Sequence, residues 1–115
     1  MTGPTPLPGR KVRGSRTGRP IMALLDLLGR RWALRVLWEL RDDSTPTFRQ
    51  LQQRCDGVSS SVLADRLREL GQADLVEHAG EGYLLTGQGR TLLECLAQLD
   101  AWAADWRPKA ADWQP

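Results

Sequence analysis

Apolar side chains return every three or four residues in five separate stretches of the chain, and this spacing predicts five helices. The stretches are residues 21–28, 32–40, 48–55, 59–70 and 89–106. Between the last two stretches, residues 75–79 and 83–85 are short strand candidates on either side of a Gly80-Glu81-Gly82 tip. Thr86 is placed to cap the final helix. The pattern therefore predicts a mainly α domain with one small β-hairpin.

Residues 48–70 are the most informative part of the chain because their spacing is that of a helix-turn-helix. The apolar period of the first helix stops at Asp56-Gly57-Val58 and restarts in the second helix. Ser59 is well placed as the N-cap of the second helix, because its hydroxyl can accept from the free backbone N–H groups of the first turn. Gly71 suits the left-handed position after the end of that helix.

The second helix of this pair is amphipathic, and its two faces predict different roles. At 100° per residue, Leu63, Leu67 and Leu70 fall on one stripe, whereas the opposite face is polar and can enter a major groove. The residues expected at DNA are Ser59, Ser60, Ser61, Ala64, Asp65, Arg66, Arg68 and, from the first helix, Arg49. The alternative is a helix with a solvated outer face on which Asp65 and Arg68 simply pair at i,i+3.

Four runs of the sequence, taken together, are typical of one known family in their order and spacing. The runs are LDLLGRRWALRVLWEL, FRQLQQRCDGVSSSVLADRLREL, LVEH and YLLTGQGRTLL. Over about residues 20 to 106 the chain resembles the HxlR-type winged helix transcription regulators, which are relatives of the MarR group. The resemblance implies a winged helix-turn-helix and a homodimeric repressor or activator that binds double-stranded DNA. It also implies that the first and last helices build the dimer interface and that the two recognition helices lie in successive major grooves.

The resemblance also assigns roles to individual positions of the second helix. It makes Ser59 the cap serine, Ser60 and Ser61 the first residues that face the groove, and Arg66 and Arg68 the two arginines of the helix. We expect Arg66 either to anchor a phosphate or to brace the helix.

Three features depart from the family pattern. The family usually has a longer, Arg-containing wing, whereas the Gly80-Glu81-Gly82 tip and its surroundings hold no basic residue. Many members carry an oxidant-sensing cysteine just before the first helix, where this chain has Arg19-Pro20-Ile21. Asp65 puts a carboxylate on the reading face, which either accepts from a cytosine amine or weakens non-specific binding.

The last helix is apolar at steps of three and four in alternation, which is the spacing of a seam between packed helices. The positions expected in the dimer interface are Leu92, Leu96, Leu99, Trp102, Ala103 and Trp106. Trp38 and Trp102 allow two interpretations. They either fill the interface, where Trp is enriched, or line a pocket for a small-molecule effector of unknown identity between the dimer helices and the DNA-binding part.

Charge is distributed unevenly along the 115 residues, which suffice for one domain with a modest core. The net charge is +2, yet the first 20 residues hold five basic residues and no acid, so residues 21–115 sum to −3. The basic residues are Arg10, Lys11, Arg13, Arg16 and Arg19. We expect a disordered Pro/Gly-rich arm at residues 1–19, an HxlR-type domain at residues 20–106 and a C-terminal tail at residues 107–115. The arm either tracks phosphates or is a flexible terminus without a role.

Cys55, Cys95 and His78 have no spacing that would make a metal site or a catalytic set, so we expect no metal and no cofactor. Cys95 falls on the flank of the last helix's seam, where oxidation of its thiol could alter dimer pairing. A pair of cysteines without an export signal is typical of the reduced cytoplasm. We expect neither a signal peptide nor a membrane-spanning segment.

Three classes of function follow from these observations. The first, which the helix pair, the cap serines, the hairpin and the family resemblance favour, is a sequence-specific transcription regulator. The second is a winged helix used for protein–protein contact, since the acidic balance of residues 21–115, Asp65 and a wing without basic residues all reduce phosphate attraction. The third, an enzyme, is not supported, because the sequence offers no nucleophile–base pair, carboxylate pair or phosphate loop.

Overall fold

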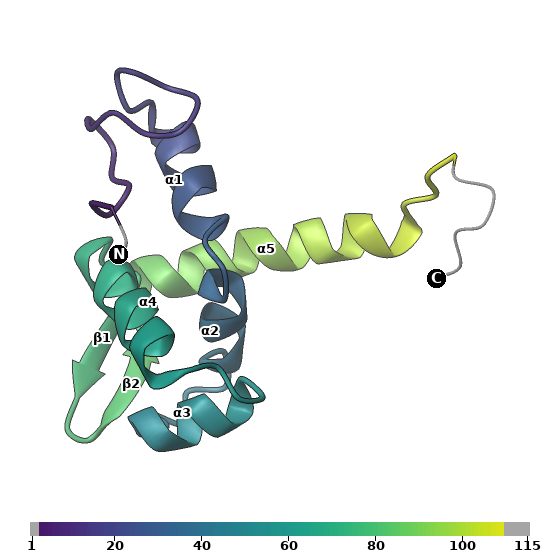
Figure 1. The fold of residues 1–115 in the computed structure, drawn as a ribbon. Helices are drawn as coiled ribbons and strands as arrows, with labels where there is room; N and C mark the ends of the chain where they lie inside the picture. The colour runs from purple at the N-terminus through teal and green to yellow at the C-terminus, as the bar shows by residue number, and fades with distance from the viewer. Residues whose placement is uncertain (1–2, 110–115) are drawn as a thin grey trace.

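The computed structural model describes residues 3–109, which form five helices and one antiparallel hairpin (Figure 1). In chain order the elements are α1 (Pro20–Leu28), α2 (Ala33–Glu39), α3 (Phe48–Arg54), α4 (Ser60–Gln72), β1 (Val76–Ala79), β2 (Gly82–Leu85) and α5 (Gly87–Asp105). Val76 pairs with Leu85 and Ala79 with Gly82 across the two strands. The predicted mainly α domain with a small hairpin is confirmed. None of the described helices is long and apolar enough to cross a membrane.

One hydrophobic core holds the helix-turn-helix against the rest of the domain. Leu37 of α2, Leu51 of α3 and Leu63 and Leu70 of α4 are all fully or almost fully buried in it. Leu85 at the end of β2 joins the same core, so the hairpin is attached to the body through its inner end. Burial of the predicted leucine stripe fixes the rotation of α4 about its own axis, and therefore fixes which face it presents to solvent.

Side-chain caps begin three of the helices. Ser59 accepts a hydrogen bond from the backbone N–H of Val62 at 3.3 Å, and Thr86 accepts from Gly89 at 3.0 Å, as the sequence predicted. Thr47 and Gln50 form a capping box at the start of α3. Each such cap contributes about 1 kcal/mol, because it satisfies a backbone donor that has no partner within the helix.

The end of α4 differs from the expectation. Gly71 lies inside the helix, which continues to Gln72, and the left-handed residue is Asp74 with φ of 57°. The backbone N–H of Leu75 reaches back to the carbonyl of Leu70 at 3.0 Å and closes the helix end. Burial of Leu75 in the core, rather than the glycine, sets the point at which the chain turns.

The N-terminal segment also differs from the expectation, because residues 3–19 are packed on the domain instead of forming a disordered arm. Thr5 is 2% exposed, and its hydroxyl is hydrogen-bonded to the side chain of Gln72 in α4. Arg30 donates to the carbonyl of Pro4 at 3.0 Å, and Val12 pairs with Ser15 in a tight turn. The arm prediction failed because proline and glycine were taken as signs of disorder, whereas here they build turns over α1 (Figure 1). Residues 1–2 lie outside the described part.

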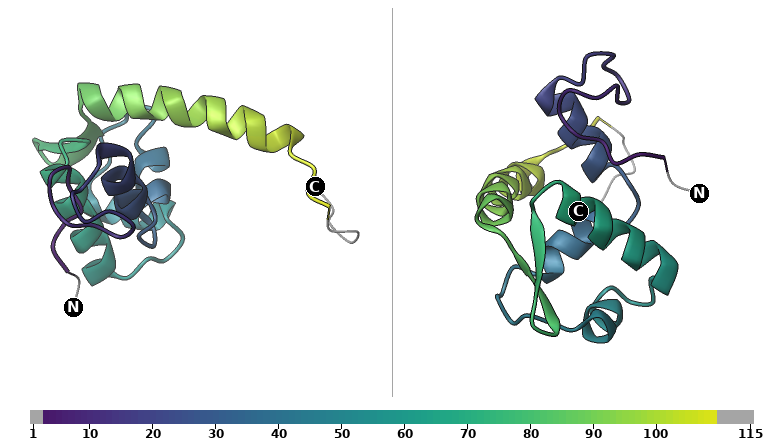
Figure 2. Two further views of the ribbon diagram at one scale, coloured as in Figure 1. Left: turned by 90° about the horizontal axis from the view of Figure 1, so that it is seen from above. Right: turned by 90° about the vertical axis from the view of Figure 1, so that its left-hand side faces the viewer.

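Helix α5 runs past the body of the domain and carries its second half away from it (Figure 2). Leu92 and Leu96 are partly buried against the body, whereas Leu99, Trp102 and Trp106 are 59%, 61% and 53% exposed. The rings of Trp102 and Trp106 stack with their centroids 5.8 Å apart. Of the predicted tail at residues 107–115, only residues 107–109 belong to the described part of the chain.

Candidate nucleic-acid interface

The turn between α3 and α4 is held in place by side chains that the sequence analysis did not single out. Asp56 and Gly57 adopt left-handed conformations with φ of 54° and 91°, which reverse the chain. The amide of Gln52 donates across the turn to the carbonyl of Val58 at 3.0 Å and to the hydroxyl of Ser60 at 3.1 Å. The two helices of the motif are therefore linked at the start of α4.

Arg35 of α2 fixes the other side of this turn. Its guanidinium donates to the carbonyl of Arg54 at 2.8 Å and pairs with Asp56 at 2.9 Å and with Glu39 at 2.8 Å. The hydrogen bond to Glu39 raises the pKa of Arg35 above its usual value, with Asp56 acting in the same direction. The arginine therefore stays charged, and it ties the turn of the motif to the core helix behind it.

The outward face of α4 carries most of the residues expected at DNA. Ser60, Ser61, Ala64 and Arg68 are exposed, and Asp65 is partly exposed beside them. Arg68 and Asp65 form an i,i+3 ion pair at 3.7 Å, with about half of each side chain open to water. So weak a contact leaves the guanidinium able to exchange the carboxylate for another acceptor. Ser59 is occupied as the cap, and Arg49 is exposed on the neighbouring helix α3.

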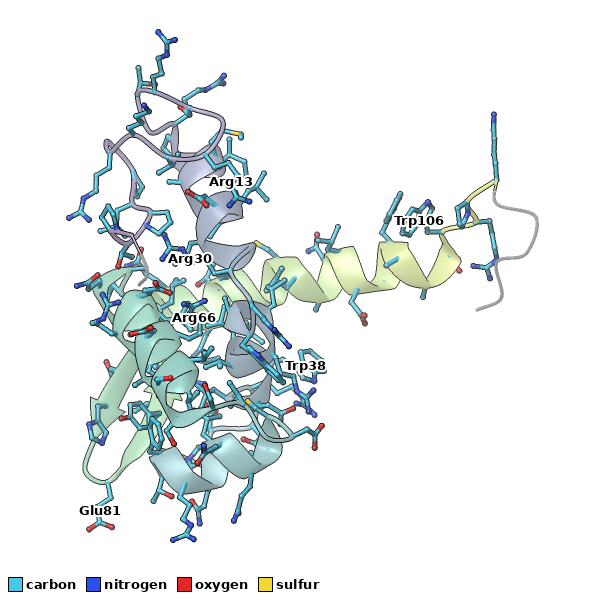
Figure 3. All side chains as sticks on the ribbon, in the orientation of Figure 1. Arg13, Arg30, Trp38, Arg66, Glu81 and Trp106 are labelled. Atoms are coloured by element: carbon cyan, nitrogen blue, oxygen red, sulfur yellow. The ribbon has the colours of Figure 1, made fainter. Side chains whose placement is uncertain are left out.

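Arg66 was expected either to anchor a phosphate or to brace its helix, and its burial agrees with the second role. It is 6% exposed, lies within 3.0 Å of Glu69 and donates to the carbonyl of Arg31 at 3.2 Å. Its guanidinium is directed toward the body of the protein (Figure 3). The missed signal was the leucine period itself, because position 66 is three residues from Leu63 and four from Leu70, on the buried side of the helix.

Glu69 is the buried partner that the sequence analysis did not anticipate. It is 1% exposed and pairs with both Arg66 of its own helix and Arg30 in the segment between α1 and α2. A buried carboxylate requires paired cations, and here they come from two elements. The cluster Arg30, Glu69 and Arg66, which we call the buried ion triad, joins the recognition helix to the first two helices.

The hairpin lies beside the motif in the position of a wing. The backbone N–H of Tyr83 donates to the carbonyl of Pro46 at 2.9 Å, and Thr47 and Gly82 form an isolated bridge, so β2 is attached to the start of α3. A side chain at Gly82 would collide with the backbone of Thr45. Glu81 projects from the tip (Figure 3), and residues 76–85 contain no lysine or arginine. The wing therefore presents a negative charge where a basic residue would favour phosphate.

Helices α1, α2 and α5 carry large apolar side chains that are exposed to solvent. The large apolar side chains that are at least 45% exposed are Ile21, Leu25, Leu34, Trp38, Leu99, Trp102 and Trp106. Between these helices lies an open groove of about 500 Å³, lined almost entirely by leucine and isoleucine side chains and by Cys95. Exposed apolar surface of this extent on a small protein marks an interaction site.

The two thiols are expected to differ sharply in reactivity. Burial raises the pKa of the Cys55 thiol, and this side chain is 0% exposed, whereas Cys95 is exposed. The raised pKa keeps Cys55 in the unreactive thiol form at pH 8. Brief iodoacetamide treatment at that pH, followed by mass spectrometry, should therefore leave Cys55 unmodified, and denaturation should expose it to full labelling. Native labelling of Cys55 at its denatured rate would contradict the buried position.

Comparison with known proteins places these features in context. Residues 27–111 match the model of the HxlR-like helix-turn-helix family. An uncharacterized HTH-type transcriptional regulator of Methanocaldococcus jannaschii is 29% identical over 90 residues, which cover 75% of this chain and 84% of that protein.

Solved structures show the same similarity. Quinone-bound YodB of Bacillus subtilis superimposes with a TM-score of 0.70 at 30% identity, over 75% of this chain and 97% of that chain. A regulator of the MarR family from Enterococcus faecalis superimposes with a TM-score of 0.65 at 30% identity, over 73% and 82% of the two chains. Helix-turn-helix regulators of transcription thus share both the sequence pattern and the winged architecture described above.

Proposed function

Because this chain belongs to the HxlR-like helix-turn-helix family of transcriptional regulators, we propose that it represses transcription as a homodimer bound to a palindromic operator. The observation that carries the proposal is the exposed face of α4, where Ser60, Ser61 and Arg68 lie beside the capped N-terminus of a rigidly held helix. Free backbone N–H groups and the helix dipole at that end favour phosphate, and Arg68 is suited to guanine.

The second copy in the proposed dimer covers the apolar surface of α1, α2 and α5. The exposed half of α5 has the seam spacing of packed helices, and the neighbouring groove is apolar enough to receive a helix of the same kind. Two-fold symmetry would place two α4 helices about one turn of DNA apart, so the half-sites should repeat at about 10 bp.

The direct test is fluorescence anisotropy of the purified protein with DNA from upstream of its own gene and with a scrambled control, each over a salt series. Tight binding that depends on the sequence supports the proposal. If binding is weak and equal for both DNAs, the operator is selected from a random DNA library. Failure of that selection to yield a preferred sequence would overturn the proposed function. Absence of binding even at low salt favours a winged helix that contacts other proteins. This is the second candidate function, because Glu81 on the wing and the Asp65–Arg68 ion pair both reduce attraction to phosphate.

Arg68→Ala should weaken binding to the selected operator by about 1–3 kcal/mol, because a base contact of the guanidinium would be lost. The matched control is Arg16→Ala, which removes the same charge from the exposed N-terminal segment. If that segment contacts phosphates, the control variant lowers affinity for operator and scrambled DNA equally and flattens the salt dependence. Equal losses on both DNAs for Arg68→Ala would exclude it as a base-reading residue.

A small-molecule effector is part of the proposal. The related YodB has been solved with quinone bound, which shows that a relative of this chain takes a small organic molecule. In this chain the apolar groove contains Cys95, so we propose that oxidation or alkylation of this thiol alters dimer pairing. Cys95→Ser should remove any peroxide response of DNA binding, and an unchanged response in that variant would exclude the thiol.

A further inference from the structure

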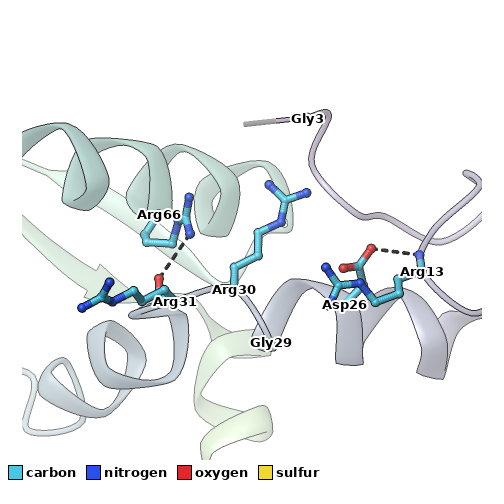
Figure 4. Close-up of a pocket in the computed structure, with 7 residues that line it drawn as sticks. All are labelled: Gly3, Arg13, Asp26, Gly29, Arg30, Arg31 and Arg66. Carbon is cyan, nitrogen blue, oxygen red and sulfur yellow. Dashed lines mark hydrogen bonds between the residues drawn. The ribbon is translucent and has the colours of Figure 1, made fainter. Parts of the chain in front are cut away.

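A second cavity, of about 350 Å³, opens between the N-terminal segment, the end of α1 and the inward-facing side of α4 (Figure 4). Four of its seven lining residues are arginines, namely Arg13, Arg30, Arg31 and Arg66. Arg30 and Arg66 lie together on one side of the cavity, and Arg13 and Asp26 lie on the other (Figure 4). The cavity therefore joins cations from three separate parts of the chain, namely the N-terminal segment, the segment between α1 and α2, and α4.

The acidic groups nearby do not neutralise these cations. Asp26 accepts a hydrogen bond from the backbone N–H of Arg13 at 3.1 Å, and it forms no ion pair with any described side chain. Glu69 does not line the cavity, and its carboxylate is shared between Arg30 and Arg66. The guanidinium groups of Arg13, Arg30 and Arg66, with Arg31 at the edge, thus outnumber the two nearby carboxylates, and this excess of positive charge favours an anion.

Several guanidinium donors also remain without acceptors. The side chains of Arg13 and Arg31 make no hydrogen bond or ion pair within residues 3–109, and the Arg31 side chain turns away at the edge of the cavity. The buried Nε of Arg66 lies 3.0 Å from Oε1 of Glu69, yet the two atoms are not aligned for a hydrogen bond, and neither has another partner. A buried donor in this state is costly, so an additional acceptor that lets the group realign is favoured.

We propose that this cavity binds a small free oxyanion, the phosphate or carboxylate group of a metabolite, and that the bound anion changes the affinity of the protein for DNA. The planar fork of arginine matches both kinds of oxyanion. The volume is sufficient for a small metabolite rather than a bare ion alone.

The coupling to DNA follows from the residues that the two sites share, and it rests on the function proposed above. Arg30 and Arg66 bind Glu69, and Glu69 and Arg66 belong to α4. An anion in the cavity competes with the Glu69 carboxylate for the same guanidinium groups. Binding therefore alters how the recognition helix is attached to α1 and α2, and by linkage DNA binding alters the anion affinity by the same factor.

The test begins with the protein alone, so that it does not depend on DNA binding. Inorganic phosphate is titrated into the full chain by isothermal calorimetry, with sodium chloride of equal ionic strength as the reference. We expect saturable binding that Arg13→Gln weakens about tenfold, the effect of losing one charge-assisted hydrogen bond. Arg16→Gln removes the same charge from the same segment outside the cavity, and it should leave phosphate affinity unchanged.

Phosphate binding no stronger than chloride binding, or equal losses in the Arg13→Gln and Arg16→Gln variants, would overturn the site. A second measurement separates a free anion from the phosphates of DNA. With phosphate absent, Arg13→Gln should bind the operator as the matched Arg16→Gln variant does, and only Arg13→Gln should lose the response to added phosphate. Without phosphate, an operator affinity of Arg13→Gln below that of Arg16→Gln would assign the cavity to the DNA backbone and overturn the proposal of a free effector.

Discussion

Leu99→Glu should convert the protein from a dimer to a monomer and abolish tight binding to an operator with two half-sites. Leu99 is 59% exposed on the half of α5 that extends beyond the domain, and it borders the apolar groove. A carboxylate buried there without a partner should raise the dimer dissociation constant at least about a hundredfold. Each monomer then contributes one recognition helix, and the gain in affinity from two linked sites is lost.

The matched control is Ala101→Glu, which adds the same charge two residues further along α5 and about 200° around the helix. Its position is exposed, and it should leave both the mass in light scattering and the operator affinity unchanged. The rate of Cys95 alkylation gives a second readout, because the partner covers this thiol in the proposed dimer and Leu99→Glu should uncover it. A Leu99→Glu protein that remains dimeric would place the interface elsewhere.

Glu69→Ala should lower the free energy of unfolding by about 3–5 kcal/mol, because it leaves the buried Arg66 and the mostly buried Arg30 without their carboxylate. Glu69→Gln should lose less stability, since the amide oxygen can still accept a hydrogen bond from one of the two arginines. Urea denaturation followed by circular dichroism measures both variants, and a ligand-free buffer keeps phosphate from replacing the missing carboxylate.

The control for this prediction lies on the same helix. Asp65 also forms an i,i+3 ion pair, but Asp65 and Arg68 are 41% and 47% exposed, so Asp65→Ala should change stability by about 1 kcal/mol at most. The two substitutions therefore show whether the loss of stability depends on the burial of the ion pair or only on its i,i+3 spacing. Similar small losses for Glu69→Ala and Asp65→Ala would show that the buried ion triad does not hold α4 to the rest of the domain.

The sequence predicted those features that depend on neighbouring residues. Helix caps at Ser59 and Thr86, the buried leucines of α4 and the hairpin all arise from interactions within a few residues, so local patterns reveal them. The outward face of α4 followed from the same period. That face was inferred correctly for Arg68. For Arg66 the sequence left a phosphate contact and a bracing role both open, because charged residues are rarely buried, and only the assembled structure shows that this position is buried.

The remaining features depend on residues far apart in the chain. Arg35 reaches a turn about twenty residues later, and Arg30 reaches Glu69 across thirty-nine positions. Such contacts have no periodic signature, and no local pattern shows that Thr5 will meet Gln72. The packed N-terminal segment, the arginine-lined cavity and the rigid turn of the motif therefore emerged only once the helices were assembled.

Helix α5 is long, and its second half extends away from the domain, so a small tilt at its base moves its far end by a much larger distance. It has 19 residues, so it is about 28 Å long, and a tilt of about 10° at its base displaces the far end by about 5 Å. That base begins directly after the wing strand, where the Thr86 hydroxyl also donates to the carbonyl of Asp74 at 2.6 Å. A small rotation at the base of α5 in each of two paired copies would therefore change the distance between the two recognition helices. The change would be comparable with one base-pair step. The half-site spacing that the dimer can bind thus depends on helix movements that are too small to disturb the hydrophobic core.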